Sequence, residues 1–195
     1  MYPPTPAFAM SDDAQPLLTL EPFIEAVQDG ITRSGWVLSG LQKTTSHQFE
    51  GRWEGESSRS AYLFFHDDEG PDFVSIDVFL DETTKGLKGN LALVVTGPEL
   101  GLLGSMPDLL AALAKVTADC LPEHAHTPFV LRLRMDDPKD DPRAAETEVR
   151  IKLTIPSEAL SSGASAVSAL ASATTAAFQR VLAHQGLRSL LIEAG

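Results

Sequence analysis

The most metal-like spacing in the chain is a pair of histidines, His124 and His126, separated by one alanine. A structural zinc site needs four ligands and a catalytic site three, drawn from Cys, His, Asp or Glu at recognised spacings. No cysteine or carboxylate stands at such a spacing, and Pro122 and Pro128 flank the pair. We therefore expect a surface loop here and no bound metal.

Carboxylates gather at three places where they could bind a cation or act as a catalytic pair. Two are runs, His66–Glu69 and Asp136–Asp141, which lack the spacing of a calcium-binding loop; Pro138 interrupts the second. The third is the pair Asp77 and Asp81, four residues apart on one face of an expected strand, as a general acid and base would need. We expect solvated turns for the runs and a solvent-facing pair on the strand.

Nucleophilic catalysis and phosphate binding find no support either. The one cysteine, Cys120, lies in an apolar helical stretch, which favours a buried, unreactive thiol. No G-x-S-x-G motif is present to hold a catalytic serine, and Gly101–Gly104 lacks the Lys-Ser/Thr of a phosphate loop. His47 and His184 are isolated in the sequence. These observations predict a protein that is not an enzyme and uses no cofactor.

The charge of the chain favours protein partners over nucleic acid. Among its 195 residues, 27 are acidic and 15 basic, which gives a net charge of −12. Such a surface repels phosphate, so neither direct nucleic-acid binding nor membrane binding is expected. It would attract a basic protein, or it serves solubility alone. Nine acidic residues and one basic residue, Arg59, fall between Glu54 and Glu82, which predicts an acidic docking face or ordinary solvation.

The elements that position these residues begin with a helix over residues 20–34, followed by Gly35 as its stop and by Trp36, which we expect to fold onto the core. The apolar stripe of this helix consists of Phe23, Ile24, Val27 and Ile31. Four strand-like runs separated by turn signals then predict an antiparallel meander over 47–53, 60–66, 73–80 and 90–96. In the third run Val74, Ile76, Val78 and Leu80 face one way, and Phe73, Ser75, Asp77 and Phe79 the other.

The second half of the chain predicts two further helices around a pair of strands. A Leu-rich helix is expected over residues 105–121, and alternating runs predict strands at 129–135 and 147–155. A closing helix over 157–185 has a sustained apolar stripe, and its Ala- and Ser-rich first half could pack on its own sheet or serve dimerisation. Gly163 weakens the prediction for its first turns.

The domain organisation is expected to be simple. Residues 1–16 are Pro-rich and predict a disordered leader, with Met10 as an alternative start, and residues 17–195 predict a single α+β domain. The leader lacks the basic and long apolar regions of a signal peptide, and no run approaches 18 apolar residues. A cytoplasmic location is therefore expected.

The order of these elements resembles the YbjN family of bacterial proteins and, through it, the chaperones of type III secretion. The resemblance spans residues 17–183 and rests on the opening helix ended by Gly35-Trp36, the meander, the Leu-rich helix, the two strands and the Pro-initiated closing helix. The run at 90–96, the acidic loop at Asp136–Asp141 and the long Ala/Ser-rich helix depart from the pattern. The resemblance implies an acidic cytosolic homodimer that binds other proteins; the YbjN group is also described as regulators of sensory transduction.

The order helix, strands, helix, two strands, helix predicts an α+β fold in which helices cover an antiparallel sheet, in the manner of type III secretion chaperones. We expect a non-enzymatic protein-binding module, a homodimeric chaperone-like or adaptor protein whose partner has a basic or amphipathic surface. The alternative is a sensory or regulatory protein of the same fold that binds a small ligand. An enzyme would need perturbed acids or histidines gathered in a cleft, and no motif indicates one. No residues of the partner-binding surface are predicted.

Overall fold

The computed structural model describes residues 20–46, 58–83, 86–97, 106–121, 129–134 and 146–185. Their elements, in chain order, are α1 (Glu21–Thr32), β1 (Val37–Ser46), β2 (Ser58–His66), β3 (Val74–Thr83), β4 (Gly86–Gly97), α3 (Met106–Cys120), β5 (Phe129–Arg134), β6 (Glu146–Thr154), α4 (Ser157–Ser161) and α5 (Ala164–Ala183). The predicted α+β class and the order helix, strands, helix, two strands, helix are confirmed. The leader 1–16, the run 47–53, Gly101–Gly104, His124–His126 and Asp136–Asp141 lie outside the described residues.

The six strands form one sheet in the order β1-β2-β3-β4-β6-β5. Every neighbouring pair is antiparallel. The first four strands are a meander, in which β2, β3 and β4 lie at the predicted runs 60–66, 73–80 and 90–96. Strand β6 then pairs with β4, which leaves β5 at the border beyond it. Among the described residues, the two edges of the sheet are therefore β1 and β5.

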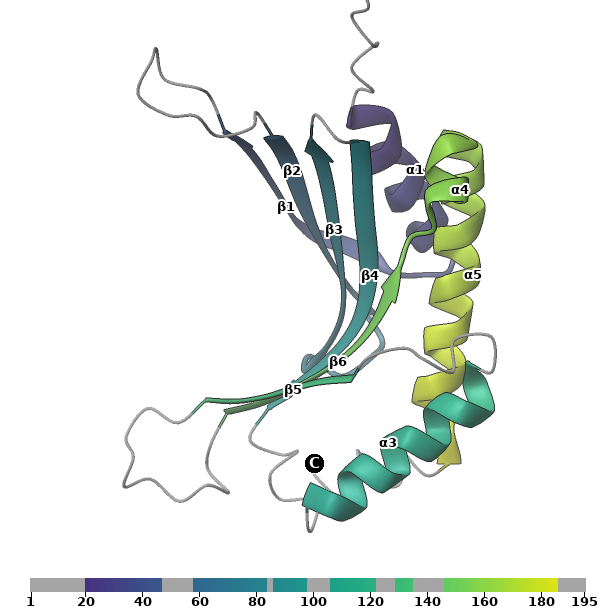
Figure 1. Ribbon diagram of the computed structural model, residues 1–195. Coiled ribbons are helices and arrows are strands. Elements are labelled where there is room, and N and C mark those ends of the chain that lie inside the picture. The colour runs from purple at the N-terminus through teal and green to yellow at the C-terminus, as the bar shows by residue number, and fades with distance from the viewer. Residues whose placement is uncertain are drawn as a thin grey trace, which may run out of the picture.

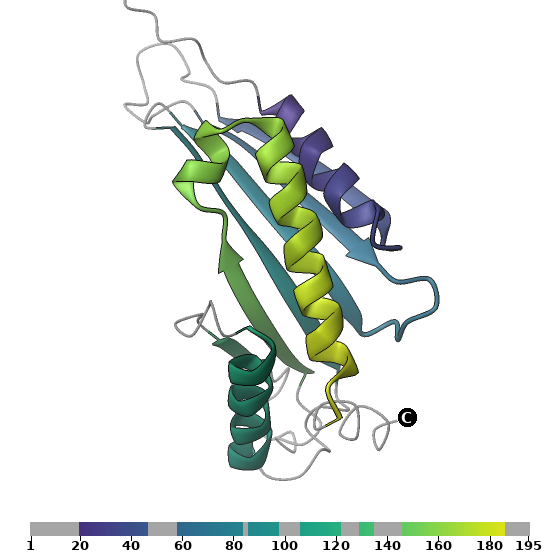
Figure 2. The ribbon, with the colours of Figure 1, turned by 90° about the vertical axis from the view of Figure 1, so that its right-hand side faces the viewer.

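Helices α1 and α5 run side by side over one face of the sheet (Figures 1 and 2). No helix among the described residues lies on the opposite face, which we call the uncovered face (Figure 1). Alternation along each strand turns one row of side chains toward the helices and the next toward the uncovered face. The position of a residue in its strand therefore shows which face of the sheet its side chain occupies.

The hydrophobic core fills the space between the sheet and the helices. The predicted stripe of α1 is buried, as is Trp36, of which only 2% is exposed. On the helix side of β3 the four predicted side chains are buried, and α5 adds Val167, Phe178 and Val181. Burying a large apolar side chain contributes about 1.5–3 kcal/mol relative to leaving it in water. The core therefore fixes which face of the sheet turns toward the helices.

Helix α1 approaches α5 closely at Gly30. A Cβ atom at Gly30 would lie 2.4 Å from the carbonyl oxygen of Ser168 and 2.8 Å from the Cβ of Ala171. A residue without a side chain on α1 and small residues on α5 are what allow this contact. The Ala/Ser-rich half of α5 is thus used within the chain, which favours the packing interpretation over the dimerisation interpretation.

The structure contains one strand that was not predicted and divides one predicted helix. The unpredicted strand is β1, Val37–Ser46, whereas the predicted run at 47–53 lies outside the described residues. The closing helix is divided into α4 and α5, because Gly163 has a φ of +94°, which is outside the helical region. No described helix is both long and apolar enough to cross a lipid bilayer.

Candidate partner-binding surface

A charged network on the uncovered face joins strands β3 and β6 across β4. Nη2 of Arg150 on β6 lies 3.0 Å from Oδ2 of Asp77 on β3, and its Nε donates a hydrogen bond to Glu148. Because β4 lies between β3 and β6, the arginine side chain must cross β4 to make this contact. Ala92 and Val94 of β4 are each only 2% exposed, although they face away from the core. The arginine therefore covers β4 as well as pairing with the aspartate.

Asp77 is a carboxylate of this face whose pKa is shifted by its surroundings. Burial raises its pKa above the ordinary value of 3.8, and a hydrogen bond from Ser75 and the charge of Arg150 lower the pKa in part. The Ser75 hydroxyl donates to its Oδ1 over 3.0 Å. Its neighbours across the register are Phe64 on β2 and Ala92 on β4, so it stands between apolar groups. The arrangement holds a carboxylate in place on the sheet.

The predicted pair Asp77 and Asp81 does share one face, but the two carboxylates have separate partners. Asp81 accepts a hydrogen bond from the hydroxyl of Ser60 over 2.8 Å. Asp77 is held by Ser75 and Arg150 instead. The two carboxylates therefore do not act on a common point, as a catalytic acid and base would have to.

An aromatic patch lies beside these carboxylates and consists of Tyr62 and Phe64 on β2 and Phe79 on β3. The rings of Tyr62 and Phe79 are register partners with centroids 4.9 Å apart. Tyr62 and Phe64, on the strand next to the edge strand β1, are each 38% exposed. Asp77 and Asp81 border the patch on β3, so its apolar surface has an acidic rim.

Exposed apolar side chains occur on the edge strand β1 and on its neighbour β2. Among the residues whose side-chain exposure the structure describes, the exposed large hydrophobic ones are Val37 (39%), Leu41 (43%), Tyr62 (38%) and Phe64 (38%). The first two belong to the edge strand β1 and the others to its neighbour β2. Grouped apolar exposure marks interaction sites more often than scattered exposure does.

No family model, curated protein or solved structure matches this chain. The resemblance to the YbjN family and to type III secretion chaperones consequently stays a prediction.

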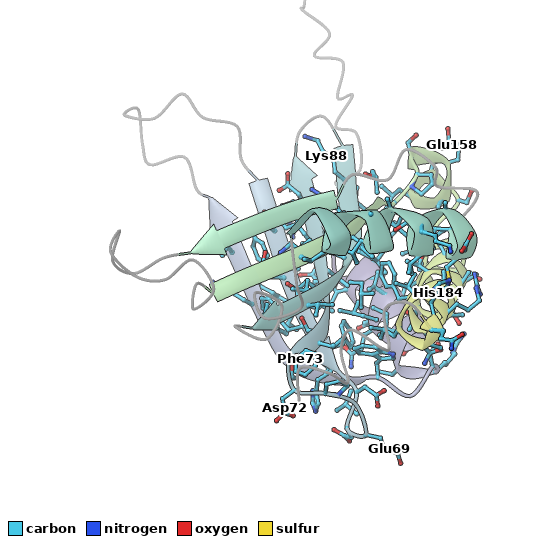
Figure 3. The ribbon with its side chains drawn as sticks, turned by 90° about the horizontal axis from the view of Figure 1, so that it is seen from below. Glu69, Asp72, Phe73, Lys88, Glu158 and His184 are labelled. Atoms are coloured by element: carbon cyan, nitrogen blue, oxygen red, sulfur yellow. The ribbon has the colours of Figure 1, made fainter. Side chains whose placement is uncertain are left out.

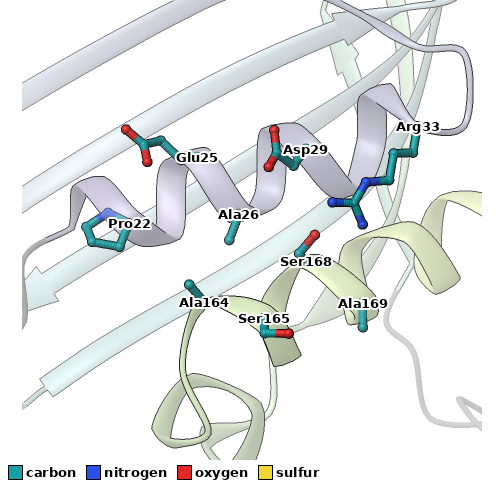
Figure 4. A pocket seen from close by; sticks show the side chains of 9 residues that line it. All are labelled: Pro22, Glu25, Ala26, Asp29, Arg33, Ala164, Ser165, Ser168 and Ala169. Atoms are coloured by element: carbon teal, nitrogen blue, oxygen red, sulfur yellow. The ribbon is translucent and has the colours of Figure 1, made fainter.

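A shallow groove of about 450 Å³ lies on the helix side of the sheet, between α1 and α5 (Figure 4). Glu25 and Asp29 of α1 and Arg33 at the C-cap of this helix line it, together with Ser165 and Ser168 of α5. The Ser168 side chain points toward α1, and its Oγ is buried with no hydrogen-bond partner among the described residues. A buried hydroxyl without a partner costs about 1–3 kcal/mol, so a ligand that hydrogen-bonds to it would gain affinity there.

The predicted acidic turn at His66–Glu69 is stabilised by contacts among its own residues. Nε2 of His66 lies 2.7 Å from Asp68, and the backbone N–H of Glu69 donates to the side chain of Asp67. Glu69 and Asp72 point away from the molecule in Figure 3. Within the described residues, no group of three or more His, Cys, Asp or Glu side chains could hold a metal ion.

Two residues that the sequence singled out have structural contacts at the α3–α5 junction. The partly buried thiol of Cys120 lies 3.6 Å from the carbonyl oxygen of Arg180, and burial raises the pKa of this thiol. A raised pKa disfavours the reactive thiolate. His184, which is isolated in the sequence, lies 3.3 Å from a carboxylate oxygen of Asp119.

Glu82 belongs to the acidic segment between Glu54 and Glu82 but does not face solvent. It occupies the helix side of β3, is only 5% exposed and lies 2.9 Å from Nη2 of Arg59. The two groups form an ion pair by distance, although they are not aligned for a hydrogen bond. The acidic segment is thus divided among the turn, the uncovered face and the helix side.

Proposed function

We propose that this chain is a non-enzymatic protein-binding module, a homodimeric chaperone-like or adaptor protein of the cytoplasm. Its partner binds the uncovered face at the aromatic patch, Tyr62, Phe64 and Phe79. The observation that carries the proposal is the exposure of two neighbouring aromatic side chains, Tyr62 and Phe64, on the uncovered face. Aromatic residues are enriched where protein surfaces bind one another, because they offer large apolar area with few rotatable bonds.

The partner is expected to present arginine or lysine side chains together with an apolar stripe. A guanidinium or ammonium group gains energy over the face of an aromatic ring and more beside a carboxylate. Tyr62 provides such a ring, and Asp81 borders the patch that contains it. The net charge of −12 would also steer a basic protein toward this chain over longer distances.

The proposal is tested by affinity capture from an extract of the source cell, with mass spectrometry of the retained proteins. Wild-type protein is compared with a Tyr62→Ser, Phe64→Ser variant, which removes two exposed rings and leaves the core intact. We expect one protein to be strongly enriched by the wild type and lost with the variant. Equal retention by both proteins would sink the assignment to the aromatic patch.

A matched control separates the patch from the rest of the face. Lys152 and Thr154 on β6 are exposed strand residues away from the patch. A Lys152→Ser, Thr154→Ser variant should retain the partner as the wild type does. If this control also loses the partner, the loss reflects a general disturbance of the sheet, and the proposal has no support.

A second candidate function rests on the groove between α1 and α5. The unpaired, buried hydroxyl of Ser168 favours a small polar ligand there, as in a sensory or regulatory protein. A metabolite that binds this groove should raise the melting temperature of the wild type and do so less for a Ser168→Ala variant. An equal shift in both proteins would place the ligand elsewhere.

A further inference from the structure

Strand β1 leaves one of its backbone edges unpaired within the described part of the chain. It occupies the border of the sheet and pairs only with β2 (Figure 1). The strand is ten residues long and contains no proline. A free edge of this length presents a row of N–H and C=O groups that can accept another strand.

The apolar exposure at this border occurs on both faces of the sheet. Leu41 is the register partner of Leu63, which is buried under the helices, so Leu41 points to the helix side. Val37 is the register partner of His66 and points to the uncovered face. Residues 41–44 are all exposed, which means that neither face covers this end of β1. A partner packed on one face of the sheet would cover either Leu41 or Val37. A strand added to the edge of β1 would cover both side chains.

The apolar surface at the edge continues from β1 onto β2 at the register pair of Gly40 and Phe64. Gly40 is paired with Phe64, and a Cβ atom at Gly40 would lie 3.3 Å from the Phe64 ring. Because the glycine has no side chain, the Phe64 ring is the outermost side chain of its row on the uncovered face. A strand added beyond β1 could therefore contact this ring directly.

Charge identifies a second copy of the chain as an acceptable occupant. Two copies with a net charge of −12 repel each other wherever their acidic surfaces meet. Strand β1 contains one charged residue, Lys43, and no acidic residue. Its edge is thus a part of the surface where two copies can approach without opposing carboxylates. Two antiparallel copies of one strand are related by a two-fold axis, which closes the assembly at a dimer.

We propose that two copies pair through the free edges of β1, which forms one continuous sheet with α1 and α5 of both copies on the same side. This inference rests on the homodimer of the proposed function and assigns its surface. The pairing covers Leu41 and Val37 and brings the two aromatic patches onto one shared face. A partner protein would then be held by two patches at once, and a dimer would bind it more tightly than a monomer does.

The test is light scattering coupled to size-exclusion chromatography on the full chain. Wild type is compared with Leu41→Lys, which places a charge at the free edge, and with Thr154→Lys, which places the same charge at an exposed position on β6 inside the sheet. Leu41 and Thr154 are both exposed, so both variants should fold, and circular dichroism checks this. We expect a dimeric wild type, a monomeric Leu41→Lys and a dimeric Thr154→Lys.

A monomeric wild type, or a Leu41→Lys variant that remains dimeric, would overturn the assignment. Partner binding by the same three proteins separates this failure from failure of the proposed function. A chain that captures its partner through the aromatic patch while remaining monomeric refutes the β1 pairing alone.

Discussion

Arg150 on β6 reaches over β4 to Asp77 on β3, with 3.0 Å between its Nη2 and the aspartate Oδ2. Replacing Arg150 with alanine would leave a largely buried carboxylate without its cation and would uncover Ala92 and Val94. We expect Arg150→Ala to lower the free energy of unfolding by about 1–3 kcal/mol, the usual cost of losing a charged hydrogen bond. Urea unfolding measures the change. Lys152→Ala, an exposed residue of the same strand and face, should cost less than about 0.5 kcal/mol.

The raised pKa of Asp77 predicts how its contribution to stability varies with pH. Because its folded-state pKa is higher than its ordinary value of 3.8, the folded protein holds this proton more tightly than the unfolded chain does. The stabilisation from this group is complete below that ordinary value and is lost as the pH rises through the folded-state pKa. Wild type should therefore lose stability relative to Asp77→Asn over this interval. A stability difference between the two proteins that is constant or moves the other way would contradict this.

Gly30 predicts a large effect from a single added methyl group. In an open helix, Gly→Ala stabilises by about 1 kcal/mol, but a Cβ at Gly30 would overlap the Ser168 carbonyl oxygen and Ala171. We expect Gly30→Ala to lower the melting temperature because overpacking costs about 1–3 kcal/mol. Gly40→Ala is the matched control, since its Cβ meets only a Phe64 ring that can shift. Equal melting temperatures for the two variants would show that the α1–α5 contact is looser than described.

Salt should act in opposite directions on the two proposed interactions. Raising the ionic strength screens attraction between the acidic chain and a basic partner, so partner affinity should fall. The same screening weakens the repulsion between two copies with a net charge of −12, so dimerisation should strengthen. Calorimetric titration of the partner at two salt concentrations measures the partner affinity. Calorimetric dilution of the dimer at the same two concentrations measures its dissociation constant. Partner affinity that is independent of salt would argue against a basic partner.

The elements with clear alternation could be predicted because only one of their faces is apolar. In β3 and β6 the buried and outward side chains follow the predicted alternation. Strand β1 was missed because its sequence, VLSGLQKTTS, has no apolar periodicity, as expected of an edge strand with little core to build. The break between α4 and α5 depends on the positive φ of Gly163, which the sequence could suggest but not establish.

The candidate surface was harder to predict than the fold. In β2 both alternating sets are apolar, so the pattern does not show that Ala61, Leu63 and Phe65 point inward while Tyr62 and Phe64 point outward. The contact between Arg150 and Asp77 joins residues 73 positions apart (150 − 77) and depends on the strand order. Burial of Glu82 depends on its even-numbered position in β3, a signal that the alternation of that strand did contain.

The central claim is that the aromatic patch on the uncovered face binds a partner protein. The most direct measurement is calorimetric titration of the purified, captured partner into wild type, into Tyr62→Ser, Phe64→Ser and into the Lys152→Ser, Thr154→Ser control. We predict that the patch variant loses at least about tenfold in affinity, equivalent to about 1.4 kcal/mol, while the control binds as the wild type does. A patch variant with the same Kd as the wild type would contradict the claim.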